Sequence, residues 1–225
     1  MRCLGCALPL HHWGSPAALT STHTDAPGGQ TSARHCQSCR TSPPTLASCH
    51  AALDYDYPWD RCITAFKFGD QPGLARVMAH LMWHSPGIAP TLEAADLVVP
   101  MPLSNERLRA RGYNQAHELA RELRRLWRNG RTPTVGQPRY SAHLLHRLRD
   151  TRAQSALDAK ARKTNLLQAF HVLPADHAQV QGRRVVVVDD IMTTGASLHE
   201  AARTLLLAGA CHVSGVVLAR TPAVS

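Results

Sequence analysis

Apolar runs and amphipathic stretches alternate along most of the chain, and this alternation predicts strands separated by helices. Four consecutive valines at 185–188 are typical of a strand buried on both faces, as in a parallel sheet. Shorter apolar runs predict three more strands, at 96–102, 169–173 and 213–218. We therefore expect an α/β fold whose sheet is mainly parallel and flanked by helices.

Helical spacing of apolar residues predicts three helices between these strands. Their apolar faces are Leu74, Val77, Met78, Leu81 and Met82; Ala116, Leu119, Ala120, Leu123 and Trp127; and Leu198, Ala201, Ala202 and Leu205. Gly209 is placed to end the third helix. Ser155 is placed to cap a fourth helix that reaches Asn165. Phe66 and Phe68 are expected in the core.

Two acids and a hydroxyl-rich turn follow the four valines. Asp189 and Asp190 are expected where the strand ends, and Thr193–Ser197 leads into the third helix. Loop N–H groups and a helix N-terminus bind phosphate, while carboxylates accept hydrogen bonds from vicinal sugar hydroxyls. The stretch therefore suits a phosphorylated sugar. A buried strand that ends in a solvated acidic turn is the alternative, and phosphoacceptor and metal-binding folds also place Asp-Asp after an apolar strand.

Composition adds a strong positive charge. The 225 residues carry 25 Lys+Arg against 16 Asp+Glu, a formal net charge of +9, and this length is sufficient for one domain and a small appendage. Between 107 and 152 there are twelve arginines and only three acids. No apolar run reaches bilayer length and the first residues lack a signal-peptide core, so we expect a cytoplasmic protein with no membrane span.

Arginines recur at spacings of three and four residues beside the apolar face of the second helix, which predicts a basic stripe. They are Arg121, Arg124, Arg125 and Arg128. Such a stripe suits a nucleic-acid backbone, because phosphates attract arginine. A solvated face with no ligand is the alternative. Few aromatic residues are available for base stacking, and the candidates are Tyr113, Trp127 and Tyr140.

The N-terminal segment contains two C-x-x-C pairs. Cys3 and Cys6 form the first pair, and Cys36 and Cys39 form the second. Each tight turn presents two thiolates, so together the pairs match tetrahedral zinc, whereas reducing conditions disfavour disulfides. We predict a zinc-finger-like module over residues 1–50 and the main domain over 51–225. His11, His12 and His35 are alternative ligands, and the unpaired Cys49, Cys62 and Cys211 are expected to behave as small apolar residues.

The segment 188–197, V-D-D-I-M-T-T-G-A-S, resembles the signature of type I phosphoribosyltransferases, which bind 5-phosphoribosyl-1-diphosphate (PRPP). Several motifs in one order extend the resemblance to the ComF (GntX-like) family of bacterial DNA uptake. They are the C-x-x-C pairs, F-K-F-G at 66–69, V-P-M-P-L and R-L-R-A-R-G-Y-N-Q within 99–115, T-R-A-Q at 151–154, R-K-T-N and A-F within 162–170, and A-R-T at 219–221. The long loop between the cysteine pairs departs from the family pattern.

The resemblance implies where PRPP would bind. In phosphoribosyltransferases paired acids hold the ribose, here Asp189 and Asp190. The next loop holds the 5-phosphate, which corresponds to Thr193, Thr194, Gly195, Ala196 and Ser197. The loop after the first core strand clamps the diphosphate; the candidates are Pro100, Met101, Pro102, Arg107, Arg109 and Arg111. Mg²⁺ that bridges diphosphate and ribose would offset the departing charge. Threonine at 193 replaces the acid of purine-salvage relatives, which disfavours purine salvage.

The resemblance implies a PRPP-binding, phosphoribosyltransferase-like protein that handles single-stranded DNA in natural transformation. The first alternative is a metabolic phosphoribosyltransferase whose acceptor the sequence does not reveal. The second is a zinc-finger adaptor that docks a DNA-translocating helicase and retains a vestigial PRPP pocket. No residue is assigned a catalytic role.

Overall fold

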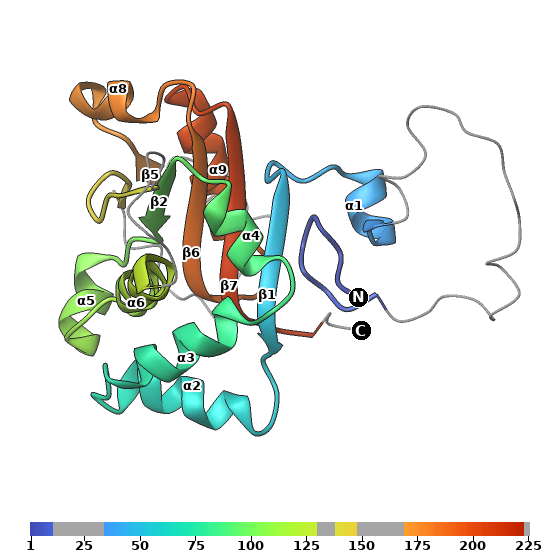
Figure 1. Ribbon diagram of the computed structural model, residues 1–225, viewed down its shortest axis with the longest axis vertical. Coiled ribbons are helices and arrows are strands. Elements are labelled where there is room, and N and C mark those ends of the chain that lie inside the picture. Colours follow the sequence, from blue (N-terminus) through green and yellow to red (C-terminus); the bar gives the residue numbers. More distant parts are fainter. Residues whose placement is uncertain (11–33, 130–137, 148–168, 223–225) are drawn as a thin grey trace, which may run out of the picture.

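A five-stranded parallel sheet forms the centre of the computed structural model (Figure 1). The structure describes residues 1–10, 34–129, 138–147 and 169–222. In spatial order β1-β7-β6-β2-β3, all neighbours pair in parallel, which confirms the predicted fold class. The strands are β1 (Ser48–Asp54), β2 (Leu97–Pro100), β3 (Arg139–Tyr140), β6 (Arg184–Met192) and β7 (His212–Arg220).

Helices cover both faces of the sheet (Figure 1). One face packs against α2 (Trp59–Phe68), α3 (Leu74–Trp83), α4 (Ile88–Glu93) and α6 (Gln115–Asn129). The other face packs against α9 (Ala196–Leu207). Successive side chains of a strand point to opposite faces, so the four valines of β6 divide between the two cores. Val186 and Val188 pack on the first face, and Val185 and Val187 pack on the second.

Smaller elements complete the described chain. They are α1 (Gln37–Thr41), α5 (Asn105–Arg111), the 3-10 helix η3 (Pro174–Asp176), α8 (His177–Val180) and an antiparallel pair, β4 (His146–Arg147) and β5 (Phe170–His171). The strand predicted at 169–173 is thus only two residues long and pairs outside the main sheet. The predicted helix 155–165, the T-R-A-Q and R-K-T-N segments, His11 and His12 lie outside the described residues.

The predicted apolar faces of α6 and α9 are confirmed, since every residue named for them is buried. The face predicted for α3 is partly wrong. Ala75, Met78, Ala79 and Met82 are buried, whereas Val77 is 61% exposed, because α3 turns its small residues toward α6. The sequence pattern did not predict α2 or α4.

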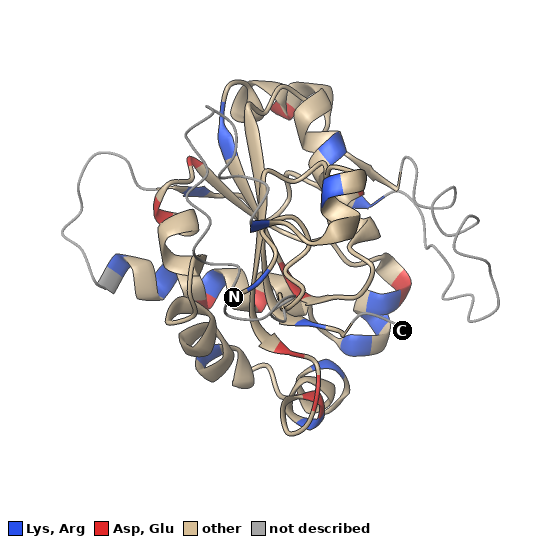
Figure 2. Ribbon diagram, turned by 90° about the vertical axis from the view of Figure 1, so that its right-hand side faces the viewer, with Lys and Arg blue, Asp and Glu red and all other residues tan. Residues whose placement is uncertain are grey.

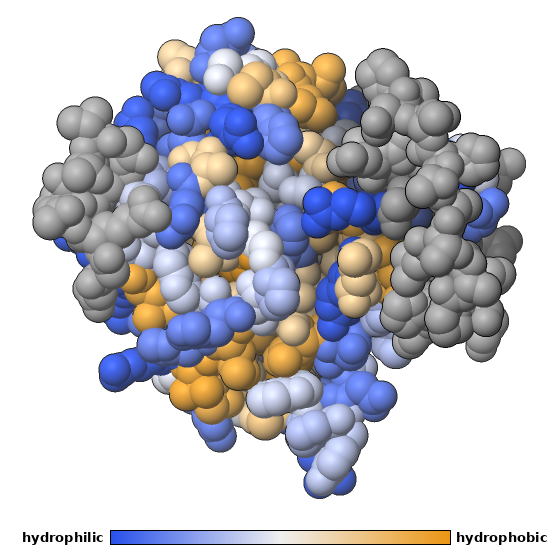
Figure 3. All heavy atoms as spheres, turned by 45° about the vertical axis from the view of Figure 1, so that its right-hand side comes forward, coloured by the Kyte–Doolittle hydropathy of each residue, from blue (hydrophilic) through white to orange (hydrophobic). Residues whose placement is uncertain are grey.

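Phe68, expected in the core, and two cysteines expected to behave as small apolar residues lie on the surface. Phe66 is fully buried, but Phe68 at the end of α2 is 69% exposed, because the two side chains are two positions apart and a helix turns them to different sides. Cys49 is buried, whereas Cys62 and Cys211 are exposed. Hydrophilic side chains cover most of the face in Figure 3, with smaller hydrophobic areas between them. In the described part of the chain no helix is long and apolar enough to cross a membrane.

The N-terminal segment packs onto the same sheet. Ala7 and Leu46 belong to the core cluster beneath α9, and the Cys49 N–H donates to the Leu4 carbonyl at 2.6 Å. The boundary predicted at residue 50 falls inside β1, which pairs with β7 along Ser48–Asp54. The division into two modules remains a prediction.

Candidate functional site

The two aspartates lie within β6, close to the carboxyl edge of the sheet. The strand continues through Met192 instead of ending at the aspartates, because the equally long β7 supplies a partner as far as Arg220. Asp190 is buried and Asp189 is half-buried. The Asp190 N–H donates to Asp189 Oδ1 at 2.9 Å, and the Ile191 N–H donates to Asp190 Oδ1 at 2.7 Å. These bonds hold both carboxylates against the backbone.

Lys67 of α2 reaches this acid pair. Its Nζ lies 3.1 Å from Asp190 Oδ2, and both side chains are largely buried. Burial and the adjacent Asp190 raise the pKa of Asp189 to about 8, an effect that Lys67 only partly offsets. One lysine thus faces two carboxyl groups, and the pair retains capacity for a cation or for hydroxyl donors. No role was predicted for Lys67 from the sequence, since the lysine is 122 positions before Asp189 in the chain.

The hydroxyl-rich turn follows directly. Thr193 and Thr194 are exposed, and Gly195 adopts φ +81° immediately before α9 begins at Ala196. The positive φ favours glycine at this position, and a Cβ there would also displace the end of the Met192 side chain. Ala196 and Ser197 form the first turn of α9, where backbone N–H groups lack helical acceptors. The structure therefore places all five predicted phosphate-binding residues at one helix start.

The segment after β2 lies beside the aspartates. Pro100 pairs with Val188, and the buried Met101 donates its N–H to the Val188 carbonyl at 2.8 Å. Asn114 fixes this segment, because its Nδ2 donates to the Met101 carbonyl at 3.0 Å while its Oδ1 accepts the Ala116 N–H. The 100–102 segment and the aspartates thus come together on neighbouring strands.

The three arginines predicted on a loop lie on helix α5 instead. Ser104 caps this helix by accepting the Arg107 N–H at 3.3 Å, which explains why the segment is helical. Burial lowers the pKa of Arg111, and the charges of Asp190 and Asp189 partly oppose this effect. Arg111 donates to Gln115 and lies over the Phe68 ring, 5.2 Å from its centroid. Arg107 is half-buried and Arg109 is exposed.

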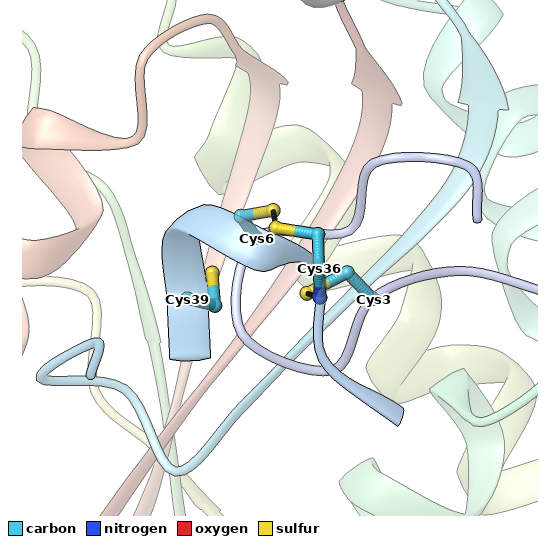
Figure 4. A group of neighbouring side chains, drawn as sticks. All are labelled: Cys3, Cys6, Cys36 and Cys39. Atoms are coloured by element: carbon cyan, nitrogen blue, oxygen red, sulfur yellow. Dashed lines mark hydrogen bonds between the residues drawn. The ribbon is translucent and has the colours of Figure 1, made fainter. Parts of the chain in front are cut away.

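The four N-terminal cysteines converge on one point (Figure 4). Their Sγ atoms all lie within 4.8 Å of one another, and Cys6 Sγ is 3.6 Å from Cys36 Sγ. That separation excludes a disulfide of about 2 Å and is close to the roughly 3.8 Å edge of a tetrahedron with 2.3 Å metal–sulfur bonds. The Cys36 N–H also donates to Cys3 Sγ at 3.2 Å, which favours a thiolate there. The cluster can hold a metal ion.

Arg220 joins this cluster to the end of β6. It is 5% exposed, and its Nε donates to the Cys6 carbonyl at 2.9 Å while its Nη1 donates to the Met192 carbonyl at 3.2 Å. Cys49 Sγ also contacts Met192 Sδ at 3.5 Å. Met192 is the last residue before the hydroxyl-rich turn. Arg220 therefore contacts both the cysteine segment and the end of the strand that leads into that turn.

The predicted basic stripe is present on α6, where all four arginines are exposed. Figure 2 marks the Lys and Arg positions of the described chain in blue and the acids in red. Two of them are ion-paired. Arg121 lies 2.6 Å from Glu118, and Arg125 pairs with Glu122. Arg124 lies over the Tyr140 ring, 5.7 Å from its centroid.

The aromatic residues named for base stacking are engaged inside the protein. Trp127 is buried, Tyr113 packs on Phe66, and the Tyr140 hydroxyl bonds His117.

Comparison with known proteins identifies the family. Residues 111–224 match the phosphoribosyl transferase domain model. The DNA utilization protein YhgH of Escherichia coli K12 is 32% identical, over 97% of this chain and 96% of that protein. The chain belongs to the ComF family. Competence protein F of Haemophilus influenzae is 31% identical over 84% of this chain and 79% of its own, and ComFC of Bacillus subtilis is 36% identical over 56% and 45%.

Several motif residues of this ComF chain have structural roles that the sequence did not reveal. Lys67 of F-K-F-G pairs with Asp190, Asn114 of G-Y-N-Q holds the segment after β2, and Arg220 of A-R-T bridges the cysteine cluster and β6. Lys67 and Arg220 act on residues far away in the chain, and Asn114 acts on Met101 in the preceding segment. A charged residue at the end of a buried strand, as at Arg220, is the one local signal that could have indicated such a role.

Proposed function

We propose that this ComF protein binds PRPP at the carboxyl edge of β6. Asp189 and Asp190 accept hydrogen bonds from the ribose hydroxyls, and Thr193–Ser197 surrounds the 5-phosphate. One observation carries the proposal: the two carboxylates, the glycine turn and the start of α9 follow one another directly along the chain at the end of β6. Helix starts favour phosphate, and a parallel sheet opens its ligand crevice at this edge.

The diphosphate is assigned to the segment after β2. Pro100, Met101 and Pro102 lie beside Asp189, and Arg111 supplies positive charge from α5. Arg107 is a second candidate, because it influences the pKa of Arg111 and is therefore near it. Arg109 is exposed and is the least favoured of the three candidates for a diphosphate contact. Asp189 would help to hold Mg²⁺, which would offset the charge of the diphosphate.

We assign zinc to the cysteine cluster, in a module of residues 1–50 that precedes a phosphoribosyltransferase-like domain of residues 51–225. Four thiolates in a closed tetrahedral arrangement are typical of a structural zinc site, which leaves no coordination position for a substrate. Arg220 connects the module to the sheet.

The names of the relatives support a role in competence and DNA uptake, and we propose that single-stranded DNA is a partner of this protein. The exposed arginines of α6 are the candidate contact, as backbone phosphates attract unpaired guanidinium groups. A zinc-finger adaptor that docks a DNA-translocating helicase is the second candidate, favoured by the packing of the base-stacking candidates inside the protein. Whether a transfer reaction also occurs is a separate question from binding.

Calorimetry of PRPP, with and without Mg²⁺, tests the central assignment. Asp189→Ala/Asp190→Ala is expected to abolish PRPP binding while the circular dichroism spectrum stays that of a folded domain. Glu118→Ala is a suitable control, because Glu118 is an acid on α6 that pairs with Arg121. Unchanged PRPP affinity in the double aspartate variant would show that the likeness to phosphoribosyltransferases is one of architecture alone.

A further inference from the structure

A cavity of about 250 Å³ lies at the edge of the sheet opposite to the aspartates. It is bounded by α4 and by the first residues of β1, β6 and β7. Because these strands are parallel, the cavity is at their amino ends, whereas Thr193 follows the carboxyl end of β6. The nine residues of β6 separate the two places by roughly 26 Å.

Three neighbouring strands supply the polar lining. β1 contributes Ser48 and His50, β7 contributes His212 and Ser214, and β6 contributes Arg184. Residues two apart share a face, and the ladder places Ser48 opposite Ser214 and Arg184 opposite His212. The strand register itself therefore brings these side chains together. Among the described residues that line the cavity, none is acidic.

A hydrogen-bonded chain runs across the floor of the cavity. Ser48 Oγ lies 3.0 Å from Ser214 Oγ, which lies 3.2 Å from His212 Nε2. The Ser48 hydroxyl donates to Ser214 Oγ. The direction of the second bond depends on the tautomer of His212, because Nε2 can donate to Ser214 Oγ or accept from it.

His50 and Arg184 supply the remaining donors. The His50 ring lies so close to Gly87, at φ +85° before α4, that a Cβ there would collide with Nδ1. Burial lowers the pKa of both His50 and His212, so both rings are neutral near pH 7 and each offers one N–H. Arg184 is the positively charged residue of the cavity lining. The nearby Asp96 accepts the backbone N–H of Arg184 at 2.8 Å.

We propose that this cavity binds a small phosphate-type anion, inorganic phosphate or a phosphomonoester. Arg184, His50 and His212 line this space, and none of its described lining residues is acidic. A tetrahedral oxyanion has acceptors for a guanidinium and for imidazole N–H groups. The volume exceeds that of several waters at about 30 Å³ each, which leaves room for a small organic group. The proposal does not depend on PRPP, which is assigned to the opposite edge.

Nuclear magnetic resonance of the histidine rings tests the site directly. In ¹⁵N-labelled full-length protein, the ring signals of His50 and His212 are assigned with His50→Gln and His212→Gln and followed during titration with inorganic phosphate. A second arm uses glycerol phosphate and distinguishes an ester from the free anion. We expect saturable shifts of both rings and a higher pKa for each. Phosphate at Thr193–Ser197 would contribute to calorimetry but not to these two signals.

Two matched variants decide whether the cavity is the site. Arg184→Gln should weaken phosphate binding at His50 and His212 by about tenfold or more, because it removes a charge-assisted donor. Arg183→Gln makes the same charge change one residue earlier, outside the cavity lining, and should leave the affinity unchanged. The absence of a saturable shift at both rings, or equal affinities in the two variants, would overturn the proposal.

Discussion

Asp189 and Asp190 are adjacent but differ in their surroundings. Asp190 is buried against Lys67, while Asp189 is half-buried with no lysine of its own and has its pKa raised to about 8. In an unfolded chain an aspartate ionises near pH 3.9. A raised pKa means that ionisation is easier in the unfolded chain, so stability is lost as pH rises from about 4 to 8. A residue that lowers the stability of the fold in this way is typically retained because it binds a ligand.

We therefore predict that Asp189→Asn makes the ligand-free protein more stable above pH 8. The gain should be at least about 1.4 kcal/mol, the equivalent of one pKa unit, since asparagine keeps the shape and removes the charge. Denaturant unfolding of both proteins at pH 5 and pH 8.5 measures it. The difference should shrink at the lower pH, where Asp189 is protonated in the folded state. An equal or greater stability of the wild type at pH 8.5 would contradict the raised pKa.

Among the elements, α6 has one buried face and one charged face. Two of its four exposed arginines pair with glutamates of the same helix. Arg121 and Arg125 face Glu118 and Glu122, which leaves Arg124 and Arg128 as the better candidates for phosphate contact. We predict that Arg124→Gln/Arg128→Gln lowers the salt dependence of single-stranded DNA binding by about 1.4, because each neutralised arginine removes about 0.7 from the slope.

The measurement is the affinity for an unstructured oligonucleotide across a salt series. Arg121→Gln/Arg125→Gln should change the slope less, because those guanidinium groups already have carboxylate partners. Arg40→Gln/Arg183→Gln removes two exposed arginines elsewhere and serves as the charge-matched control. Equal salt dependence of DNA affinity in all variants would show that α6 does not contact DNA. Failure of the wild type to bind at low salt would favour the adaptor function instead.

The ends of β6 and β7 form a second element-scale unit with the N-terminal segment. Arg220→Gln leaves the carbonyls of Cys6 and Met192 without their buried donor, which should lower the free energy of unfolding by about 2 to 4 kcal/mol. Arg2→Gln is the control. It removes a half-exposed ion pair with Asp54 at 2.8 Å and should cost less than about 1 kcal/mol. Similar costs for the two variants would show that Arg220 is not a structural bridge.

At the scale of the whole molecule, the segment that carries the cysteine cluster packs on the same core as the sheet. We predict about one zinc ion per chain, bound by Cys3, Cys6, Cys36 and Cys39. Cys36→Ser/Cys39→Ser should lose the zinc and lower the melting temperature of the whole domain, because Ala7 and Leu46 belong to the main core. Elemental analysis and thermal denaturation measure both effects. Cys62→Ser/Cys211→Ser is the control, and zinc retained by the Cys36 and Cys39 variant would refute the assignment.

The sequence alone determined the parts of this molecule that depend on local pattern. Four valines, an acid pair and a glycine turn predicted a buried strand followed by a helix start, and the spacing of C-x-x-C predicted a four-thiolate cluster. These features depend on neighbours within a few positions, where backbone geometry fixes which side chains meet. For the same reason the buried faces of α6 and α9 were predicted residue by residue.

Only the tertiary structure decided what depends on strand order and helix phase. It paired Lys67 with Asp190, exposed Phe68, and placed Arg220 between Cys6 and Met192. It also gathered Ser48, His212 and Arg184 at the amino edge, from strands that are far apart in the sequence. A local sequence pattern does not encode these long-range contacts, because they follow from the strand order β1-β7-β6. That order is set by the packing of both faces of the sheet at once.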